Sequence, residues 1–212
     1  LAGERPVIAL REEERRARFR HAETARKMFD NILKKPGTPP PALTVPMSFK
    51  KAGVAVTMPP GWKRLADVPT EARLTTAVRP EGPLLVQLSH ESNPKGLDDA
   101  IRRHEAVNRI RGIRYTTLCT GRLKLDGQTW TLQQATCLSY HRIQLPTGKT
   151  KVVDVPSILT VCYRPLDKKG TDHLRVVFLY TEQTAAKVNL PGLVRQVLPT
   201  VRPLPKRNEP GK

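Results

Sequence analysis

The sequence has little of what integral membrane proteins, disulfide-stapled proteins and most enzymes are built from. Only 5% of its 212 residues are aromatic and three are cysteine. No apolar run approaches the ~20 residues of a membrane-spanning helix, and no GxSxG, HExxH or P-loop motif occurs. These absences exclude a transmembrane segment and leave the common enzyme classes without a supporting motif.

The three cysteines, Cys119, Cys137 and Cys162, stand singly in strand-like segments. An odd number without CxxC spacing argues against a disulfide framework and against a zinc site. Free cysteine packs as a small hydrophobic residue. We therefore expect all three to be buried, in a protein that resides in a reducing compartment.

The histidines are scattered, and one region combines them with carboxylates. His90 and Glu91 end a predicted strand, and His104 and Glu105 lie on the helix predicted after it. A metal or acid–base site there is an alternative, but solvated polar side chains explain the pattern without one. The sequence thus predicts no catalytic residue, no metal and no cofactor, and a protein that is not an enzyme.

Positive charge is what the sequence has in excess. It carries 37 Lys and Arg against 19 Asp and Glu, a net charge of +18. Such a balance is informative about partners and says little about fold. RNA, an acidic protein surface and an anionic lipid surface are the candidate partners.

Residues 1–35 are predicted to be a basic N-terminal helix whose second half has an apolar stripe at helical spacing. A proline-rich linker follows at residues 36–47 and is expected to be extended. Because such a linker gives the helix reach, we predict that the stripe packs on a partner and that the rest of the chain folds without residues 1–46. The predicted partner-binding residues are Arg15, Arg16, Arg18, Arg20, Arg26, Lys27, Met28, Phe29, Ile32 and Leu33.

Residues 48–202 are predicted to form one domain, followed by a polar tail at 203–212. Apolar residues alternate from Val54 to Met58, and the proline–glycine corner after them should place Trp62 in the core. Asp126 and Gly127 are the strongest hairpin signal. The order of elements predicts an α+β fold, an antiparallel β-sheet with flanking helices and a long N-terminal helical extension.

A second group of arginines lies on the polar side of the helix predicted at 97–111. These residues are Arg102, Arg103, Arg109 and Arg111, and they are candidate contacts to RNA phosphates or to an acidic surface. Aromatic residues do not alternate with them. Sequence-specific recognition of single-stranded RNA is therefore not expected.

Several short motifs occur in an order typical of one family. A strand ends in MPPGW, a helix follows two strands, a later strand enters Gly121, LDGQ forms the next hairpin, and a short helix closes the chain. In this order residues 48–202 resemble the PsbP superfamily. That family includes extrinsic oxygen-evolving subunits of photosystem II, a Ran-binding import factor and bacterial lipoproteins. The resemblance implies an α-β-α sandwich and a non-catalytic binding role, whereas the basic N-terminal helix is not part of the family pattern.

Together these features predict a non-enzymatic accessory subunit of a large organellar assembly, tethered by its basic N-terminal helix. The first interpretation is a mitochondrial respiratory-chain or ATP-synthase subunit that contacts other subunits. One alternative is a mitochondrial ribosomal protein that meets rRNA through its arginine-rich helices, and another is a plastid photosystem extrinsic subunit. A first residue of Leu instead of Met is expected either of a chain whose targeting peptide has been removed or of a fragment.

Overall fold

The computed structural model describes residues 7–34, 42–76, 84–110, 115–144 and 148–205. Within these ranges, side chains are described except at residues 7–19, 109–110, 139–144, 150–154 and 186. In the described part no helix is long and apolar enough to cross a membrane.

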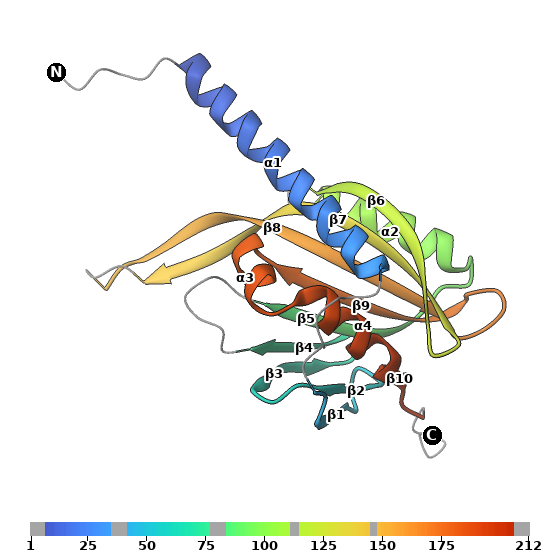
Figure 1. The fold of residues 1–212 in the computed structure, drawn as a ribbon. Helices are drawn as coiled ribbons and strands as arrows, with labels where there is room; N and C mark the ends of the chain where they lie inside the picture. Colours follow the sequence, from blue (N-terminus) through green and yellow to red (C-terminus); the bar gives the residue numbers. More distant parts are fainter. Residues whose placement is uncertain (1–6, 35–41, 77–83, 111–114, 145–147, 206–212) are drawn as a thin grey trace.

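A seven-stranded antiparallel sheet forms the centre of the molecule (Figure 1). Its strands, in spatial order, are β3 (Trp62–Val68), β4 (Glu71–Thr76), β5 (Leu85–Ser92), β9 (Asp172–Tyr180), β8 (Thr150–Pro165), β7 (Gln128–Gln144) and β6 (Thr116–Leu125). The near-continuous apolar runs of β8 and β9 fit central strands that are covered on both faces.

A smaller sheet has the order β1 (Val45–Phe49), β2 (Val54–Met58) and β10 (Arg202–Pro203). Strand β1 begins inside the range predicted as a linker. Its Pro46 is tolerated because β1 is an edge strand, where a missing N–H breaks no ladder. The residues between β2 and β3 are the proline–glycine corner, which carries the chain from the small sheet into the large one. Trp62 at its end is 9% exposed, so the prediction of a buried indole is confirmed.

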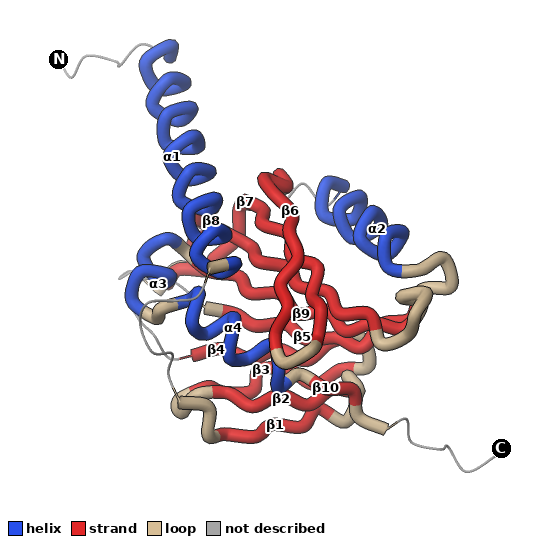
Figure 2. Tube along the Cα trace, turned by 45° about the vertical axis from the view of Figure 1, so that its right-hand side comes forward, coloured by secondary structure: helices blue, strands red, loops and turns tan. Residues whose placement is uncertain are grey.

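The helices cover both faces of the large sheet (Figure 2). They are α1 (Val7–Leu33), α2 (Leu97–Ile110), α3 (Glu182–Lys187) and α4 (Leu190–Thr200). On one side lie α1, α3 and α4, and on the other lies α2, whose Leu97 and Ile101 pack against Val161 and Val177. The predicted α+β fold with flanking helices is therefore confirmed, and the N-terminal helix is confirmed over residues 20–33.

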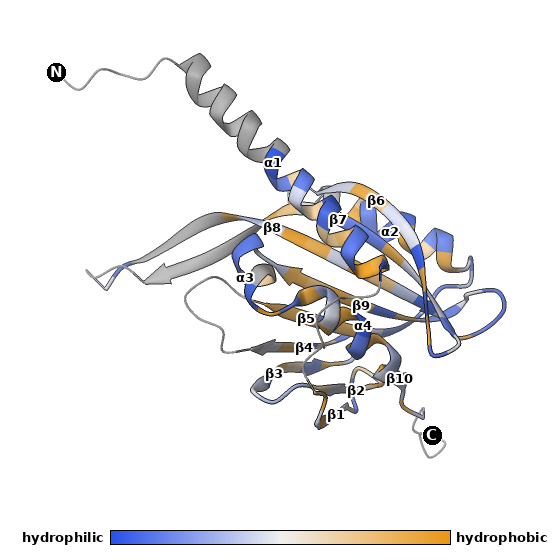
Figure 3. Cartoon of the chain, viewed as in Figure 1, coloured by the Kyte–Doolittle hydropathy of each residue, from blue (hydrophilic) through white to orange (hydrophobic). Residues whose placement is uncertain are grey.

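The hydrophobic core joins both sheets to α1, α3 and α4. Figure 3 shows hydrophobic residues concentrated on the middle strands and at the end of α1 that meets the sheet. Phe29 and Ile32 are 3% and 0% exposed, and Met28 and Leu33 are half-buried against the same core. The prediction that this stripe packs on a partner is therefore wrong: the chain's own sheet and α4 supply the apolar surface it needs.

The sequence predicted that the rest of the chain folds without residues 1–46, and the packing of this segment argues against that prediction. Removing them would expose the sheet beneath Phe29 and Ile32 and would remove Val45 and Pro46 from the ladder with β2. Burial of that apolar area is a large part of what stabilises a domain of this size.

We expect Phe29→Ala to lower the free energy of unfolding by ~3–5 kcal/mol, because a fully buried ring is replaced by a cavity. Urea unfolding followed by circular dichroism measures the change. Lys27→Ala, two residues earlier on an exposed face, is the control and should change stability by less than ~0.5 kcal/mol. Equal stability of the two variants would mean that α1 does not contribute to the core.

Candidate functional site

Helix α1 lies unusually close to strand β6, and Gly121 makes this approach sterically feasible. A Cβ atom at residue 121 would lie 3.1 Å from the Phe29 ring and 3.2 Å from Leu33 Cδ1. Contacts of that length are tight, so a side chain here would require the ends of Phe29 and Leu33 to shift by a few tenths of an ångström. The present fit of α1 against β6 therefore uses the absence of a side chain at residue 121.

Polar contacts fix the same helix at two further points. Arg195 of α4 donates from Nη1 to the carbonyl oxygens of Ile32, at 2.8 Å, and Leu33, at 3.3 Å. These carbonyls end the helix and have no partner within it, so the arginine satisfies them and complements the negative end of the helix dipole. Nearer the N-terminus, His21 lies 2.8 Å from Glu182 Oε1 and 3.2 Å from the Ser157 carbonyl.

The outward face of α1 carries unneutralised positive charge. Arg20 and Arg26 are exposed and, in the part of the chain that the structure describes, have no acidic partner, whereas Lys27 pairs with Glu23 at 2.9 Å. Residues 7–19 continue the helix away from the body (Figure 1). This continuation contains Arg15, Arg16 and Arg18, which belong to the stretch whose backbone alone is described.

The arginines predicted to form a second basic surface on α2 are in part neutralised. Asp99 pairs with Arg103 at 2.7 Å and with Arg102 at 3.7 Å. The hydrogen bond from Asn93, and then the charge of Arg103, hold the pKa of Asp99 below its ordinary value. Arg109 and Arg111 lie outside the described side chains, so α2 provides no free basic surface among the residues that can be placed.

Beneath α2 the structure assembles a buried polar cluster around Glu91. The Glu91 carboxylate lies 3.0 Å from His104 Nε2, 3.6 Å from His173 Nε2 and 3.6 Å from Arg175 Nη1. Tyr163 Oη, in turn, lies 3.2 Å from His104 Nδ1. Each of these side chains contacts another one in the cluster, so the cluster links α2 to the strands beneath it.

The environment of Glu91 keeps its carboxylate ionised. Burial alone would raise the pKa of Glu91, but the contacts with His104 and His173 and the charge of Arg175 outweigh it. The net effect is a pKa well below the usual range of glutamate. The negative charge on β5 thus holds His104 of α2 and His173 and Arg175 of β9 together.

For this region the sequence favoured solvated polar side chains, with a metal or acid–base site as the alternative, and the structure pairs the four residues in different ways. Glu91 and His104 do meet, but His90 pairs with Asp172 at 2.9 Å, and Glu105 accepts hydrogen bonds from Thr117 and Gln133. No group of three or more His, Cys, Asp or Glu side chains in the described ranges is arranged to hold a metal.

His173 and Arg175 were missed because each stands alone in the sequence. The strand pairing explains why they matter: Glu91 faces His173 across the β5–β9 ladder, and Ser89 faces Arg175. Alternation along β9 places both on the face that α2 covers. The available signal in the sequence was the spacing of two polar residues, His173 and Arg175, two positions apart in a strand that is otherwise mostly apolar.

The cysteines are poor nucleophiles in this fold. Cys137 and Cys162 are buried and Cys119 is half-buried. Burial raises the pKa of Cys137 to about 12 and also raises the pKa of Cys162. Both buried thiols are therefore protonated at neutral pH, and only a thiolate is an effective nucleophile or metal ligand.

Comparison with known proteins gives similarity of fold alone. No protein-family model matches the chain, and no curated protein sequence matches it. The chain is similar to a solution structure of cyanobacterial PsbP (CyanoP) from Synechocystis sp. PCC 6803, with 14% identity, a TM-score of 0.47 and coverage of 79% of this chain and 95% of that one. It is also similar to a mutant of protein Mog1, with 14% identity, a TM-score of 0.43 and coverage of 75% and 95%.

A third similar structure is a crystal structure of a protein from Bacteroides thetaiotaomicron VPI-5482. Its identity is 14% and its TM-score 0.41, with coverage of 81% of this chain and 51% of that one. The present chain therefore spans about half the length of the Bacteroides protein. These matches agree with the α+β fold described above and assign the chain to no family.

Glu91→Gln should make stability less dependent on pH. The pKa of Glu91 lies below its ordinary value of 4.5 in the folded state, so its carboxylate stabilises the fold above about pH 4.5 and loses that effect as the pH falls further. At pH 7 the substitution should cost about 2 kcal/mol or more, because it leaves Arg175 without its counter-charge and His104 Nε2 without its carboxylate partner.

Urea unfolding between about pH 3 and pH 7 measures this effect. The expected result is a smaller decline of stability toward acid pH in Glu91→Gln than in the wild type. Glu23→Gln, which removes an exposed carboxylate, should retain the wild-type pH profile and nearly the wild-type stability. Parallel profiles for Glu91→Gln and the wild type would contradict the assigned ionisation.

Proposed function

We propose that the protein is a non-enzymatic accessory subunit that joins a larger assembly through the basic N-terminal half of α1. The observation that carries this proposal is the two-part construction of a single 27-residue helix. Its C-terminal half is held by Phe29, Ile32 and Arg195, and its N-terminal half continues beyond the body with an excess of arginine (Figure 1).

A helix held in this way is a rigid projection. At about 1.5 Å per residue, the 14 residues from 7 to 20 extend roughly 20 Å. A rigid element loses less conformational entropy on binding than a flexible tether does. The tether proposed from the sequence is thereby revised: its reach comes from the helix itself, and the proline-rich segment after it connects two parts of one core.

The partner proposed for this helix is an acidic protein surface. Arginine pairs well with carboxylates, and complementary charge accelerates and orients association. Contact with rRNA is less favoured because the described arginines of α2 already pair with Asp99. The projecting half of the helix has a single aromatic residue, Phe19, whereas proteins that bind unpaired bases stack successive bases on several aromatic side chains.

A non-catalytic role is supported by the state of the polar groups inside the fold. Glu91, His104 and Arg175 are engaged with one another, and the buried thiols are protonated. The compartment and the complex stay predictions from the sequence. The first interpretation is a mitochondrial respiratory-chain or ATP-synthase complex, and the alternative is a plastid photosystem.

Reversing four charges in the projecting half of α1 tests the proposal. The substitutions Arg15→Glu, Arg16→Glu, Arg18→Glu and Arg20→Glu all keep good helix formers and should leave the melting temperature nearly unchanged. Affinity for the assembly, measured by co-purification at several salt concentrations and by titration of the isolated partner, should fall at least about tenfold, or 1.4 kcal/mol.

A matched control reverses four exposed charges elsewhere, with Arg122→Glu, Lys124→Glu, Lys168→Glu and Lys169→Glu. It should bind as the wild type does, which would separate a local contact from an effect of net charge. Undiminished binding of the α1 variant would refute the proposal. Binding that ribonuclease abolishes, with a steep dependence on salt, would replace the protein partner by RNA.

A further inference from the structure

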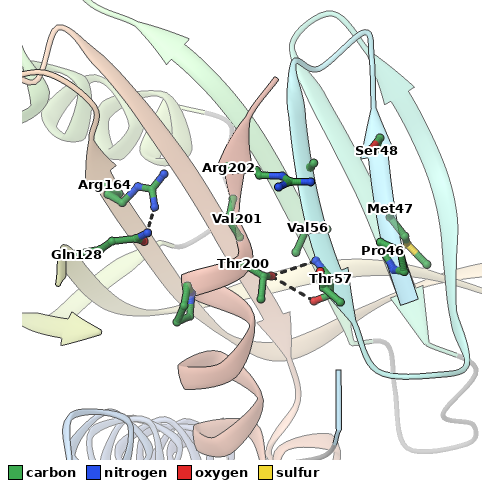
Figure 4. Close-up of a pocket in the computed structure, with 12 residues that line it drawn as sticks. Pro46, Met47, Ser48, Val56, Thr57, Gln128, Arg164, Thr200, Val201 and Arg202 are labelled. Carbon is green, nitrogen blue, oxygen red and sulfur yellow. Dashed lines mark hydrogen bonds between the residues drawn. The ribbon is translucent and has the colours of Figure 1, made fainter. Parts of the chain in front are cut away.

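A cavity of about 360 Å³ lies between the small sheet and the large one (Figure 4), and the projecting half of α1 points away from these elements (Figure 1). Met47 and Val56 line it from β1 and β2, Arg164 and Gln128 from the large sheet, and Thr200 and Val201 from the end of α4. This volume falls within the range of small-molecule sites. The cavity is therefore large enough for a compact metabolite-sized ligand.

The walls of the cavity are held in place by hydrogen bonds of their own. Thr200 Oγ1 accepts from the Thr57 backbone N–H at 3.0 Å and is 2.8 Å from the Val197 carbonyl, to which it donates. These contacts tie the end of α4 to β2, as Figure 4 shows. A preformed site of this kind does not have to be ordered when a ligand binds.

Arg164 is the chemically distinctive group in this cavity. It is 9% exposed, yet in the part of the chain that the structure describes it has no carboxylate partner. One guanidinium nitrogen, Nη1, donates to Gln128 Oε1, and the plane lies over the Trp130 ring at 5.3 Å. Its other N–H groups have no hydrogen-bond acceptor among the described residues, although a guanidinium can donate five hydrogen bonds.

An unpaired buried cation is costly, and burial accordingly lowers the pKa of Arg164. Other buried or half-buried charges of this protein, such as Glu91 and Arg175, are paired within the fold. Arg202 also lines the cavity and adds a second, exposed positive charge. The cavity thus combines positive charge, free N–H donors and a concave volume that is partly open to solvent.

We propose that this cavity binds a small organic anion whose phosphate or carboxylate group pairs with Arg164. A guanidinium offers two parallel N–H groups, which match the two oxygens of either acid group. The apolar side chains of Met47, Val56 and Val201 would contact the remainder of the ligand. This site is independent of the partner-binding role of α1 and involves none of its residues.

Isothermal titration calorimetry with inorganic phosphate, and separately with succinate, tests the proposal on the full chain. We expect one-to-one binding of at least one probe at concentrations below about 10 mM. Binding of phosphate alone would assign a phosphate ester as the ligand class, and binding of succinate alone would assign a carboxylate. Absence of one-to-one binding for both probes would overturn the proposal.

Gln128→Glu is the decisive variant because it places a carboxylate beside Arg164 without changing the shape of the side chain. The new ion pair should keep or raise the melting temperature while weakening binding at least about tenfold. Gln183→Glu makes the same substitution at an exposed position of α3 and should bind as the wild type does.

Arg164→Gln should abolish one-to-one binding and is informative where its melting temperature shows that it folds. Equal affinity of Gln128→Glu and the wild type would overturn the proposal, since it would show that the probes bind to the general positive charge of the surface. Loss of binding in the Gln183→Glu control would overturn it for the same reason.

Discussion

The close approach of helix α1 to strand β6 is the constraint on which much of the molecule depends. It exists because Gly121 leaves room for the Phe29 ring and for Leu33. Once the helix is seated, Arg195 can reach its last carbonyls and His21 can reach α3. The direction in which the arginine-rich half of α1 leaves the body follows from this seating and from the contacts of Arg195 and His21.

Charge inside the fold is handled in three different ways. Arg195 is used to complete a helix end, and Glu91 gathers two histidines and an arginine beneath α2. Arg164 differs from both, because its neighbours are an amide and an indole ring. Paired charges fix the positions of neighbouring elements, whereas an unpaired one retains capacity for a further interaction.

The parts of the fold that local sequence signals dictate could be predicted. Asp126 and Gly127 adopt the positive φ values of 47° and 76° that a two-residue hairpin needs, and the strands beside them pair as expected. Strand β1 was missed because it contains Pro46 and follows a proline-rich segment, and because its partner β2 lies in a different sheet from β3. The packing of Phe29 on the sheet could not be predicted from the sequence. An apolar stripe on a helix has the same sequence pattern whether it packs on the protein's own sheet or on a partner protein.

The site was less predictable than the fold, for a related reason. Glu91 and His104 are close in the chain, and their pairing was weighed as an alternative, whereas His173 reaches Glu91 only through the ladder of β5 with β9. Arg164 gave no signal of its own in a sequence with 37 basic residues. What distinguishes it is the absence of a carboxylate nearby, and that is a property of three-dimensional neighbours.

The pairing of β10 with β2 has a consequence for how the protein is made. Arg202 and Pro203 complete a sheet whose other strands, β1 and β2, emerge from the ribosome far earlier. Until α4 and β10 have been synthesised, Val54, Val56 and Met58 lack the cover that buries them in the finished fold. Contacts of such long sequence separation form slowly and leave apolar strands exposed in the meantime. Nascent chains should thus leave these apolar strands uncovered, and accessible to chaperones, until residues 190–203 have left the ribosome.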